Sequence, residues 1–458
     1  MKKTEELFGT GSIWRAIAQM SIPAVITMLV MVIYNMVDMY FVSKTGEAAQ
    51  IAAISLASPV FQAQSAFGTL IGAGGCAVIS NALGKGDWVK VKASSGACMV
   101  MVLVSGILLG SLILLFPDFV MNLLGADSDT WQFTKDYVCI LAGGMVFSIF
   151  STVFANIIRA EGASKESMIG NGIGTVANMI LDPIFILWLD MGVKGAALAT
   201  VLGNVLAAIF YLYYFLRRET ALSLHPKYVL PMPVVFGSVL LLGVPSAISN
   251  LLAGLTNTIS NHILIGYGAS TVAAVGVGGK ASMIVTMVVM GICIGVQPVI
   301  AYNYGAGDKK RTKEALYKTG ILALGVGIGL TAFCFLFRNR IAAMFLEDPS
   351  LLEQSVHIME IHLILVPFIG LYYIGVNFLQ AAGKALLATV LSAFRQGIFY
   401  VPAILSLHQI AGLEGVYYTG VVTDLGAILL SVSLLLWQMK KGFAKSGDDV
   451  QQEVGTVV

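Results

Sequence analysis

Residues 94–116, SSGACMVMVLVSGILLGSLILLF, form a run without a single charged side chain. As an α-helix, a run of this length covers the hydrocarbon core of a bilayer, which takes about 20 apolar residues. Barrel strands would instead alternate apolar and polar residues over about half that length. Similar runs fall at residues 14–42, 51–82, 132–158, 167–189, 195–216, 234–265, 270–303, 315–337, 354–380, 385–407 and 413–439. The sequence therefore predicts an all-α polytopic membrane protein with twelve transmembrane helices.

The composition agrees with a membrane protein. Apolar residues of the AVILMFWYC set make up 57% of the chain and charged residues 11%, against roughly 25% charged residues in soluble domains. The formal charge of +2 is small and the basic residues are scattered through loops, which argues against a nucleic-acid partner. The five cysteines lie in apolar runs without C-x-x-C spacing, so no disulfide framework is indicated. We expect a monomer in the lipid bilayer, without a cofactor.

The distribution of basic residues predicts the orientation. An even number of spans places both termini on one side of the membrane. The connections on that side hold 20 of the 27 Lys and Arg residues, the opposite connections hold 5, and Lys280 and Arg395 fall inside spans. Because cytoplasmic loops carry the excess of Lys and Arg, we expect both termini to be cytoplasmic. The expected location is the bacterial cytoplasmic (inner) membrane.

The second half of the chain repeats the first. A shift of 221 or 222 residues superposes residues at matching places in the two halves, in constant order: Pro23 on Pro245, Asn35 on Asn257, Gly84-x-Gly86-Asp87 on Gly305-x-Gly307-Asp308, Asn156 on Asn377 and Gly162 on Gly383. Six spans separate each residue from its counterpart, so the halves are parallel repeats about an axis along the membrane normal. The glycine loops lack the full phosphate-binding pattern and are interpreted as tight turns in which the Asp caps the next helix.

The repeat sets the expected domain organisation. We expect an N-terminal lobe at 1–216, a cytoplasmic linker at 217–232 that contains two prolines, a C-terminal lobe at 233–440 and a cytoplasmic tail at 441–458. Each lobe contains six helices. A transported molecule is expected to bind between the lobes.

Acids in the first half are candidates for a cation site. A charged side chain at the centre of a span costs about 2.5–3.5 kcal/mol even on lenient scales. Asp38 lies one helical turn after Tyr34, and Asn178 and Asp182 share a face of one helix. Thr200 in the next span adds a hydroxyl. Oxygen ligands of this kind suit Na⁺, or a proton on a buried carboxylate. The alternative is that these groups only hydrogen-bond across helices and stabilise the lobe.

The second half does not repeat these acids. Ser260 matches Asp38, and Val401 matches Asp182 when the prolines Pro183 and Pro402 are aligned. The charges inside its spans have mixed signs: Lys280, Glu360, Arg395 and Asp424. Buried ion pairing is the expected role of these four residues, with gating or substrate contact as the alternative. His357, Glu360 and His362 cannot share one helix face, so we expect no metal site apart from Na⁺.

Several motifs together resemble the multidrug and toxic compound extrusion (MATE) family of the MOP superfamily. They are Pro23 followed by Tyr34-Asn35-Met36-Val37-Asp38, the two Gly-x-Gly-Asp loops, Arg159-Ala160-Glu161-Gly162, and Leu181-Asp182-Pro183. The resemblance implies two six-helix lobes in a V that export amphipathic, often cationic compounds in exchange for Na⁺ or H⁺. The family's cation site matches Asp38, Asn178, Asp182 and Thr200 by position, and Tyr34 and Asn156 are candidates for a secondary part of it.

Three other functions differ from drug export in what they require. A lipid-linked oligosaccharide flippase of the same superfamily would need a strongly cationic cavity, whereas only Lys280 and Arg395 are basic within spans. A channel would show uncoupled flux down a gradient. An intramembrane enzyme would need a set such as H-E-x-x-H or a serine elbow, which the sequence lacks, so we expect a transporter and not an enzyme.

Overall fold

The computed structural model describes residues 2–43, 48–217, 220–228, 233–346 and 348–441, and every secondary-structure element in these ranges is a helix. The first half contains α1 (Lys2–Glu5), η1 (Glu6–Thr10), α2 (Ile13–Ser43), α3 (Ala48–Leu56), α4 (Ser58–Lys85), α5 (Trp88–Leu115), α6 (Pro117–Leu124), α7 (Trp131–Gly143), α8 (Met145–Ala160), α9 (Ser164–Asp182), η2 (Pro183–Trp188) and α10 (Val193–Arg217). The second contains η3 (Pro226–Tyr228), α11 (Val234–Ile265), α12 (Ala269–Gly305), α13 (Lys309–Leu336), α14 (Arg338–Ala343), α15 (Pro349–Leu363), η4 (Val366–Phe368), α16 (Ile369–Ala381), α17 (Ala385–Ala393), η5 (Phe394–Ile398) and α18 (Tyr400–Lys441).

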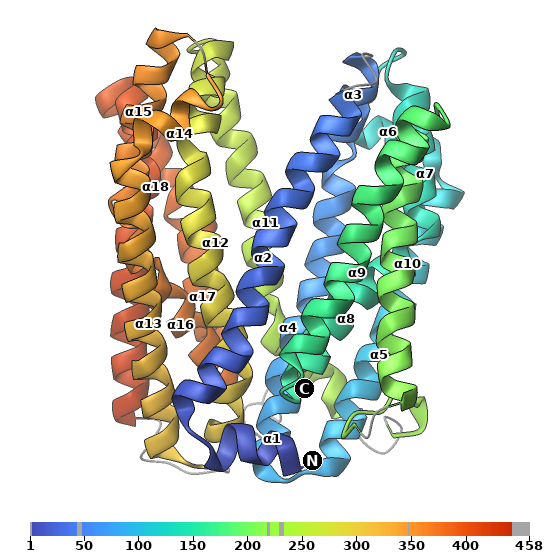
Figure 1. Cartoon of the computed structure of the whole chain (residues 1–458), viewed down its shortest axis with the longest axis vertical. Coiled ribbons are helices and arrows are strands. Elements are labelled where there is room, and N and C mark those ends of the chain that lie inside the picture. The colour runs from blue at the N-terminus through green and yellow to red at the C-terminus, as the bar shows by residue number, and fades with distance from the viewer. Residues whose placement is uncertain (1, 44–47, 218–219, 229–232, 347, 442–458) are drawn as a thin grey trace.

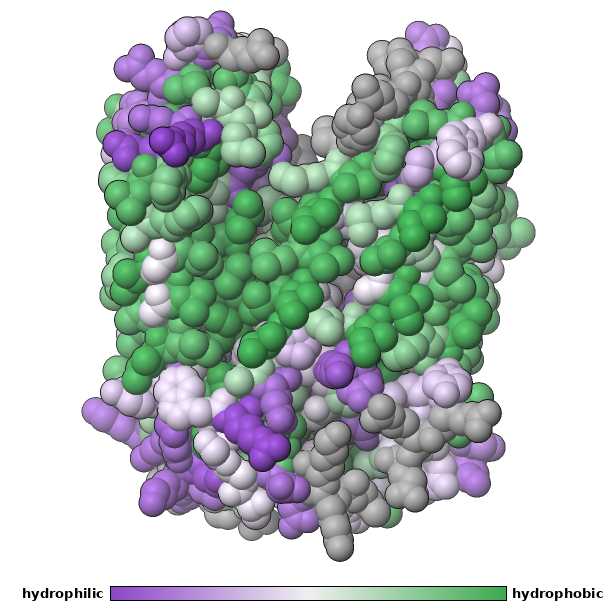
Figure 2. All heavy atoms as spheres, in the orientation of Figure 1, coloured by the Kyte–Doolittle hydropathy of each residue, from purple (hydrophilic) through white to green (hydrophobic). Residues whose placement is uncertain are grey.

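The helices form two bundles that meet at one end and separate at the other (Figure 1). We call the end that holds α1 the closed end, and the end that holds α3 and α14 the open end. A space-filling view shows the molecule hollowed between the bundles at the open end (Figure 2). The same view shows a broad hydrophobic band between two hydrophilic ends. This distribution is the one that a bilayer-spanning protein requires, because charged groups avoid the hydrocarbon core.

The number of spans differs from the prediction. Among the described residues, 10 helices are long and apolar enough to cross a membrane, or 11 if α7 and α8, which are bent by 56°, form one span. The difference from twelve lies at the C-terminal end, where the helical stretch Ala385–Lys440 covers both of the last two predicted spans. Gly412 interrupts this stretch with φ 60° and ψ −132°. Glycine adopts such angles at little cost because it has no Cβ, so the chain turns there between two helical segments.

The loop glycines form the predicted tight turns. Gly86 and Gly307 have φ of 70° and 72°, the left-handed region in which glycine is favoured. The next residue in each loop then caps the following helix: Asp87 accepts a hydrogen bond from Lys90 N, and Asp308 from Arg311 N, both at 2.9 Å. The interpretation of these loops as capped turns is confirmed.

The first long helix of each half begins inside the other half. The hydrophobic core formed largely by α12, α13 and α16 also contains Phe8 and four residues at the start of α2: Ile13, Ala16, Ile17 and Met20. The core formed largely by α4, α5 and α8 contains Val235 and Val239 from the start of α11. Ile13 and Ile17 correspond to Val235 and Val239 under the 222-residue shift. The two halves therefore exchange equivalent segments at the closed end.

The backbones of α4 and α12 touch where these two helices cross at the closed end. A Cβ added to Gly84 would lie 1.9 Å from the carbonyl oxygen of Tyr302, and one added to Gly305 would lie 2.2 Å from that of Asn81. These two contacts are equivalent under the repeat, because Asn81 and Gly84 match Tyr302 and Gly305. Contacts this close leave no room for any side chain and are typical of small residues between transmembrane helices. The two halves therefore pack backbone against backbone at the closed end, at positions that only glycine can occupy.

We predict that Gly243→Ala destabilises the protein, because its Cβ would lie 1.7 Å from Leu70 O on α4 and overpacking costs about 1–3 kcal/mol. Gly237→Ala on the same helix is the matched control, since nothing lies within 4 Å of its added Cβ. That change should be neutral or stabilising by about 0.5–1 kcal/mol. Thermal unfolding in detergent measures both effects, and equal midpoints for the two variants would contradict the packing argument.

Candidate functional site

A polar cluster lies inside the first lobe, between α9 and α10. Asp182 is fully buried and Asn178 is 3% exposed. With its amide oriented to satisfy both neighbours, Asn178 donates from nitrogen to Asp182 Oδ2 at 2.8 Å, and its oxygen lies 3.0 Å from Thr200 N and 3.2 Å from Thr200 Oγ1. The structure thus brings together three of the four residues predicted for the cation site.

Local sequence explains this arrangement. Gly174 and Gly203 face each other across α9 and α10, and a Cβ on Gly203 would lie 2.6 Å from Gly174 O. This close approach of the backbones brings Thr200 to Asn178, which lie one turn before Gly203 on α10 and one turn after Gly174 on α9. Pro183 follows Asp182 directly and starts the π-helical segment η2. A proline lacks the backbone N–H of a regular helix, so the helix changes its geometry at the carboxylate, and π segments are frequent at functional sites.

The remaining candidates of the first lobe, Asp38, Tyr34 and Asn156, lie on α2 and α8. Asp38 is part of α2, but its side chain lies outside the described residues. Tyr34 lies one turn before it on α2 and is half-buried. Asn156 on α8 donates to Thr152 O at 2.8 Å and accepts a hydrogen bond from Arg159. The Asn156 amide is therefore already engaged by a basic side chain.

Two charged residues at the end of α8 lie just past the predicted span at 132–158 but are buried in the structure. Arg159 and Glu161 are each only 8% exposed. The Glu161 carboxylate accepts hydrogen bonds from Tyr214 Oη at 2.5 Å, Thr220 Oγ1 at 2.7 and 2.9 Å, and Ala221 N at 3.2 Å. Burial raises the pKa of Glu161, and these three donors oppose the rise. The signal available in the sequence was the Arg-x-Glu-Gly motif itself, whose charges lie next to a turn.

Two of the four charges inside the spans of the second half, Arg395 and Asp424, pair with each other. Arg395 Nε lies 2.7 Å from Asp424 Oδ1, and the two side chains are 15% and 19% exposed. The Arg395 guanidinium also lies over the ring of Tyr372, 5.0 Å from its centroid. The predicted ion pairing is confirmed for these two residues. Arg395 belongs to η5, a π-helical segment in the same span of the second half as η2 is in the first.

Glu360 and Lys280 contact other residues than Arg395 and Asp424. Glu360 pairs at 2.6 Å with Arg338, and both side chains are about a third exposed, 36% and 30%. Arg338 lies just past the predicted span at 315–337, and the structure places it at the start of the short helix α14. Lys280 lies 5.4 Å from the ring centroid of Phe345. These two residues therefore pair with groups near the open end rather than with Arg395 or Asp424.

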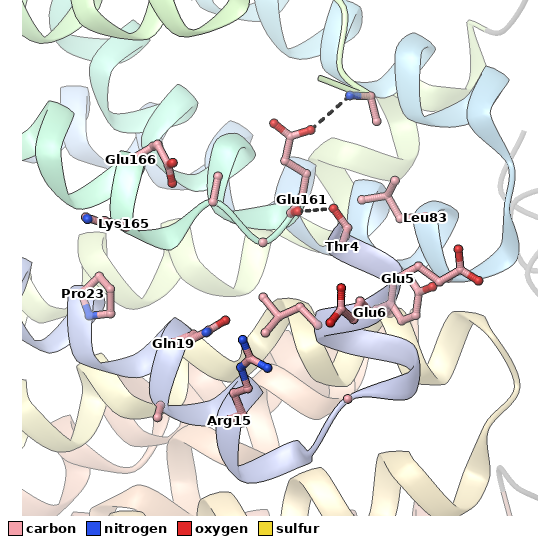
Figure 3. Close-up of a pocket in the computed structure, with 18 of the residues that line it drawn as sticks. Thr4, Glu5, Glu6, Arg15, Gln19, Pro23, Leu83, Glu161, Lys165 and Glu166 are labelled. Carbon is pink, nitrogen blue, oxygen red and sulfur yellow. Dashed lines mark hydrogen bonds between the residues drawn. The ribbon is translucent and has the colours of Figure 1, made fainter. Parts of the chain in front are cut away.

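A cavity of about 960 Å³ lies at the closed end. Its walls come from the N-terminal segment, the start of α2, the glycine loop after α4 and the loop between α8 and α9 (Figure 3). Within the described residues, no group of three or more His, Cys, Asp or Glu side chains is arranged to hold a metal ion. The polar cluster around Asp182 therefore remains the candidate for a cation, and the cavity is a separate feature.

We predict that Asp424→Asn destabilises the protein by about 3 kcal/mol, because it leaves the buried Arg395 without its carboxylate. Glu360→Gln is the matched control, and it should cost less than about 1 kcal/mol since its pair is partly exposed. The double change Arg395→Met with Asp424→Leu should recover most of the loss. Thermal unfolding measures all three variants, and similar losses for Asp424→Asn and Glu360→Gln would contradict a stabilising ion pair in the second lobe.

Comparison with known proteins identifies the family. A family model described as MatE matches residues 23–184 and again residues 245–405, which confirms the internal repeat. The multidrug export protein MepA of Staphylococcus saprophyticus is 30% identical over 432 residues, covering 92% of this chain and 94% of that protein. MepA of Staphylococcus haemolyticus is 30% identical over 436 residues, covering 94% and 96%.

Solved structures share the fold. One, described as the outward-facing conformation of a multidrug resistance MATE family transporter of the MOP superfamily, has a TM-score of 0.90 at 24% identity, covering 97% of this chain and 99% of that one. Another, MATE in the straight conformation, has a TM-score of 0.89 at 24% identity, covering 97% and 100%. From the family match, the relatives and the fold together, the chain belongs to the MatE family of multi-pass membrane transporters and not to a family of enzymes.

Proposed function

We propose that the protein is a secondary antiporter that exports amphipathic, cationic compounds in exchange for Na⁺ or H⁺. The observation that carries the proposal is the fully buried Asp182 carboxylate facing the amide of Asn178. A carboxylate at this depth in a lobe is costly, and such groups in membrane proteins mark ion or proton pathways. The relatives from Staphylococcus are multidrug export proteins by name, which supports drugs as the class of substrate.

The Asn178 amide links the three residues of the cluster. Its nitrogen donates to the Asp182 carboxylate at 2.8 Å, and its oxygen lies 3.0 Å from Thr200 N and 3.2 Å from Thr200 Oγ1. A carboxylate that accepts this hydrogen bond keeps further lone pairs for Na⁺ or for a proton. The proposed cation therefore binds at a carboxylate that the amide holds in a fixed position.

Asp38 supplies the second acid of the proposed site from α2. Its helix packs against α9, and Ser164 at the start of α9 donates to Met20 O on α2 at 2.9 Å. A cation at this site would be held by residues of α2, α9 and α10. It would therefore link α2, whose start is buried in the second lobe, to two helices of the first lobe. Tyr34 and Asn156 are proposed as secondary contacts of this site. Binding of the cation then shifts the equilibrium between positions of α2 relative to the two lobes.

The topology proposed for this function has twelve spans, with α7 and α8 as one bent span and α18 divided at Gly412. Both termini are cytoplasmic, the protein is a monomer, and its membrane is the bacterial cytoplasmic membrane. In this orientation the hollow between the lobes opens to the outside (Figure 2). This outward-open state is the one that releases a drug and binds a cation from outside. The lobes, proposed at 1–216 and 233–440, alternate access by moving against each other.

The second lobe contributes structure and substrate contact rather than coupling. Arg395 and Asp424 are bound to each other, and Glu360 to Arg338. Val401 replaces the aspartate of the first lobe. One cation site per molecule follows from this difference between the lobes.

We predict that Asp38→Asn and Asp182→Asn abolish efflux coupling while the proteins still insert, because a neutral amide neither titrates nor supplies a charged ligand for Na⁺. Efflux of ethidium from proteoliposomes, driven separately by a Na⁺ and a pH gradient, measures the coupling. Asp129→Asn, an exposed loop acid, is the matched control and should transport at the wild-type rate.

Wild-type efflux rates in both variants would rule out the proposed cation site. The wild-type response identifies the coupling ion, since only one of the two gradients should drive efflux. A wild-type protein that responds to neither gradient would count against coupled export as a whole.

A further inference from the structure

The N-terminal segment, residues 4–11, crosses the closed end between the two lobes (Figure 1). It comprises the end of α1, the short π-helical turn η1 and Gly11, and it precedes the first membrane helix. The transport function proposed above assigns no role to it. Its contacts reach residues of both halves that lie far apart in the sequence.

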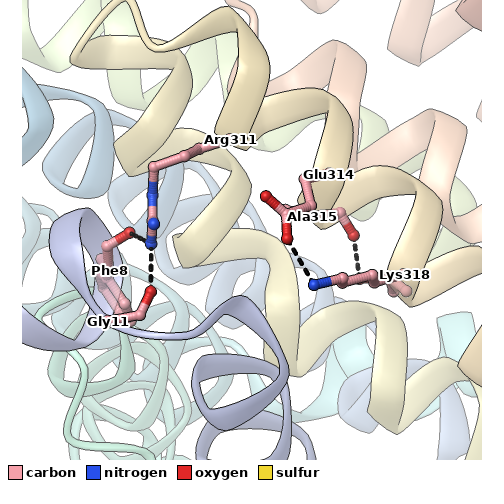
Figure 4. A network of polar contacts seen from close by, with 7 residues as sticks. Phe8, Gly11, Arg311, Glu314, Ala315 and Lys318 are labelled. Atoms are coloured by element: carbon pink, nitrogen blue, oxygen red, sulfur yellow. Dashed lines mark hydrogen bonds and ion pairs between the residues drawn. The ribbon is translucent and has the colours of Figure 1, made fainter.

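Polar contacts hold the segment to the second lobe (Figure 4). Arg311, at the start of α13, donates from Nη2 to Phe8 O at 3.0 Å and to Gly11 O at 2.9 Å. Asn303 donates to Phe8 O at 3.1 Å, and its own oxygen accepts from Arg311 Nε at 3.2 Å. Charge-assisted bonds from a guanidinium are among the stronger hydrogen bonds in proteins. The second lobe therefore binds the backbone of residues 8–11 directly.

The Phe8 side chain is an apolar anchor at the junction of the lobes. It is fully buried in the core of the second lobe, with its ring edge against Tyr302 at 5.6 Å between centroids. On its other side lies Gly162 of the first lobe, where an added Cβ would lie 3.4 Å from Phe8 Cζ and 3.5 Å from Leu7 Cδ2. Gly162 has φ of 94°, so the chain turns tightly there and leaves room for the ring.

Among the residues that the structure describes, one hydrogen bond joins the segment to the first lobe. Thr4 Oγ1 donates to Glu161 O at 2.7 Å (Figure 3). The Glu161 carboxylate is in turn bound to Tyr214, Thr220 and the backbone of Ala221, which fixes the position of its carbonyl. The segment is therefore bound more weakly to the first lobe than to the second, because its contacts with the first lobe are one neutral hydrogen bond and the packing against Gly162.

The residues that hold the N-terminal segment occur only once in the duplicated chain. Under the 221-residue shift, Arg311 corresponds to Lys90, Asn303 to Ala82 and Glu161 to Ala382. A feature that came only from the common fold would be expected in both halves. Arg311 and Asn303 are particular to the second half, and Glu161 is particular to the first.

We propose that residues 4–11 are a latch that holds the lobes together at the closed end, with Arg311 and Asn303 as its positioning residues. The latch stays seated on the second lobe and releases from Glu161 and Gly162 when the lobes separate at this end. It therefore stabilises the state that is open at the opposite end. This inference rests on the alternating access of the proposed function, but its test reads the conformation directly.

The test measures the distance between the lobes at the open end. Spin labels are attached at Leu123→Cys on α6 and Met344→Cys beside α14, which are 75% and 79% exposed. Cys139, the least buried of the five native cysteines, is replaced by Ser. Double electron–electron resonance in lipid nanodiscs then compares wild type, Thr4→Val, Arg311→Gln, Arg311→Lys and Lys310→Gln. Lys310, exposed in the same turn of α13, is the matched control for charge.

Arg311→Gln should raise the ratio of short to long distances by at most about fivefold, because its hydrogen bonds persist in both states and their loss acts only by freeing residues 8–11, which weakens the contacts with the first lobe. Thr4→Val removes one neutral hydrogen bond and should raise the ratio about fivefold. Arg311→Lys keeps a charged donor and should fall between Arg311→Gln and wild type. Lys310→Gln should leave the distances unchanged.

Wild-type distance distributions in both Thr4→Val and Arg311→Gln would overturn the latch. If Arg311→Gln does not fold, Thr4→Val alone decides, since it changes one partly buried hydroxyl. A shift equal in Lys310→Gln and Arg311→Gln would also overturn it, because loss of charge would then suffice. Failure of gradient-driven ethidium efflux in the wild type would instead contradict the antiport function and leave the distance measurement interpretable.

Discussion

The contact between bare backbones at the closed end constrains the rest of the structure. Gly84 and Gly305 each face a carbonyl oxygen of the other half at a distance that no side chain permits. Next to these contacts, the start of α2 is buried in the core of the second lobe and the start of α11 in the core of the first. Each lobe therefore completes its core with a helix that belongs to the other. A movement that opens this end has to separate these helices from the opposite core or carry them with it.

The two lobes share architecture but differ in chemistry. Each has a π-helical segment in the same span, η2 and η5, but the first carries a buried aspartate with an amide and a hydroxyl, and the second an arginine bound to Asp424. A carboxylate next to neutral oxygens can exchange a cation, whereas a carboxylate bound to a guanidinium is already neutralised. The two halves therefore share an architecture, and the proposed cation site belongs to the first half alone.

Much of the fold was predictable from the sequence, since hydropathy, helix length and the repeat depend on local properties of the chain. The capped turns at Gly86 and Gly307 were predictable for the same reason. The partner of Glu360 was not, because Arg338 lies beyond the end of an apolar run and only the tertiary structure brings it back to α15. Burial of Arg159 and Glu161 was missed as well. Hydropathy registers their charge, but the partners of the buried Glu161 carboxylate are Tyr214 and Thr220, more than 50 residues away in the chain.

The sequence by itself determined that this is a duplicated, all-helical membrane protein and which acids are candidates for a cation site. These properties follow from composition, spacing and order, which folding does not change. Only the tertiary structure decided that Asn178 faces both Asp182 and Thr200, that Arg395 pairs with Asp424, and that the chain begins with a segment bound to both lobes. Such contacts depend on how closely helix backbones approach, and that distance is set by glycines on two helices together, such as Gly174 and Gly203.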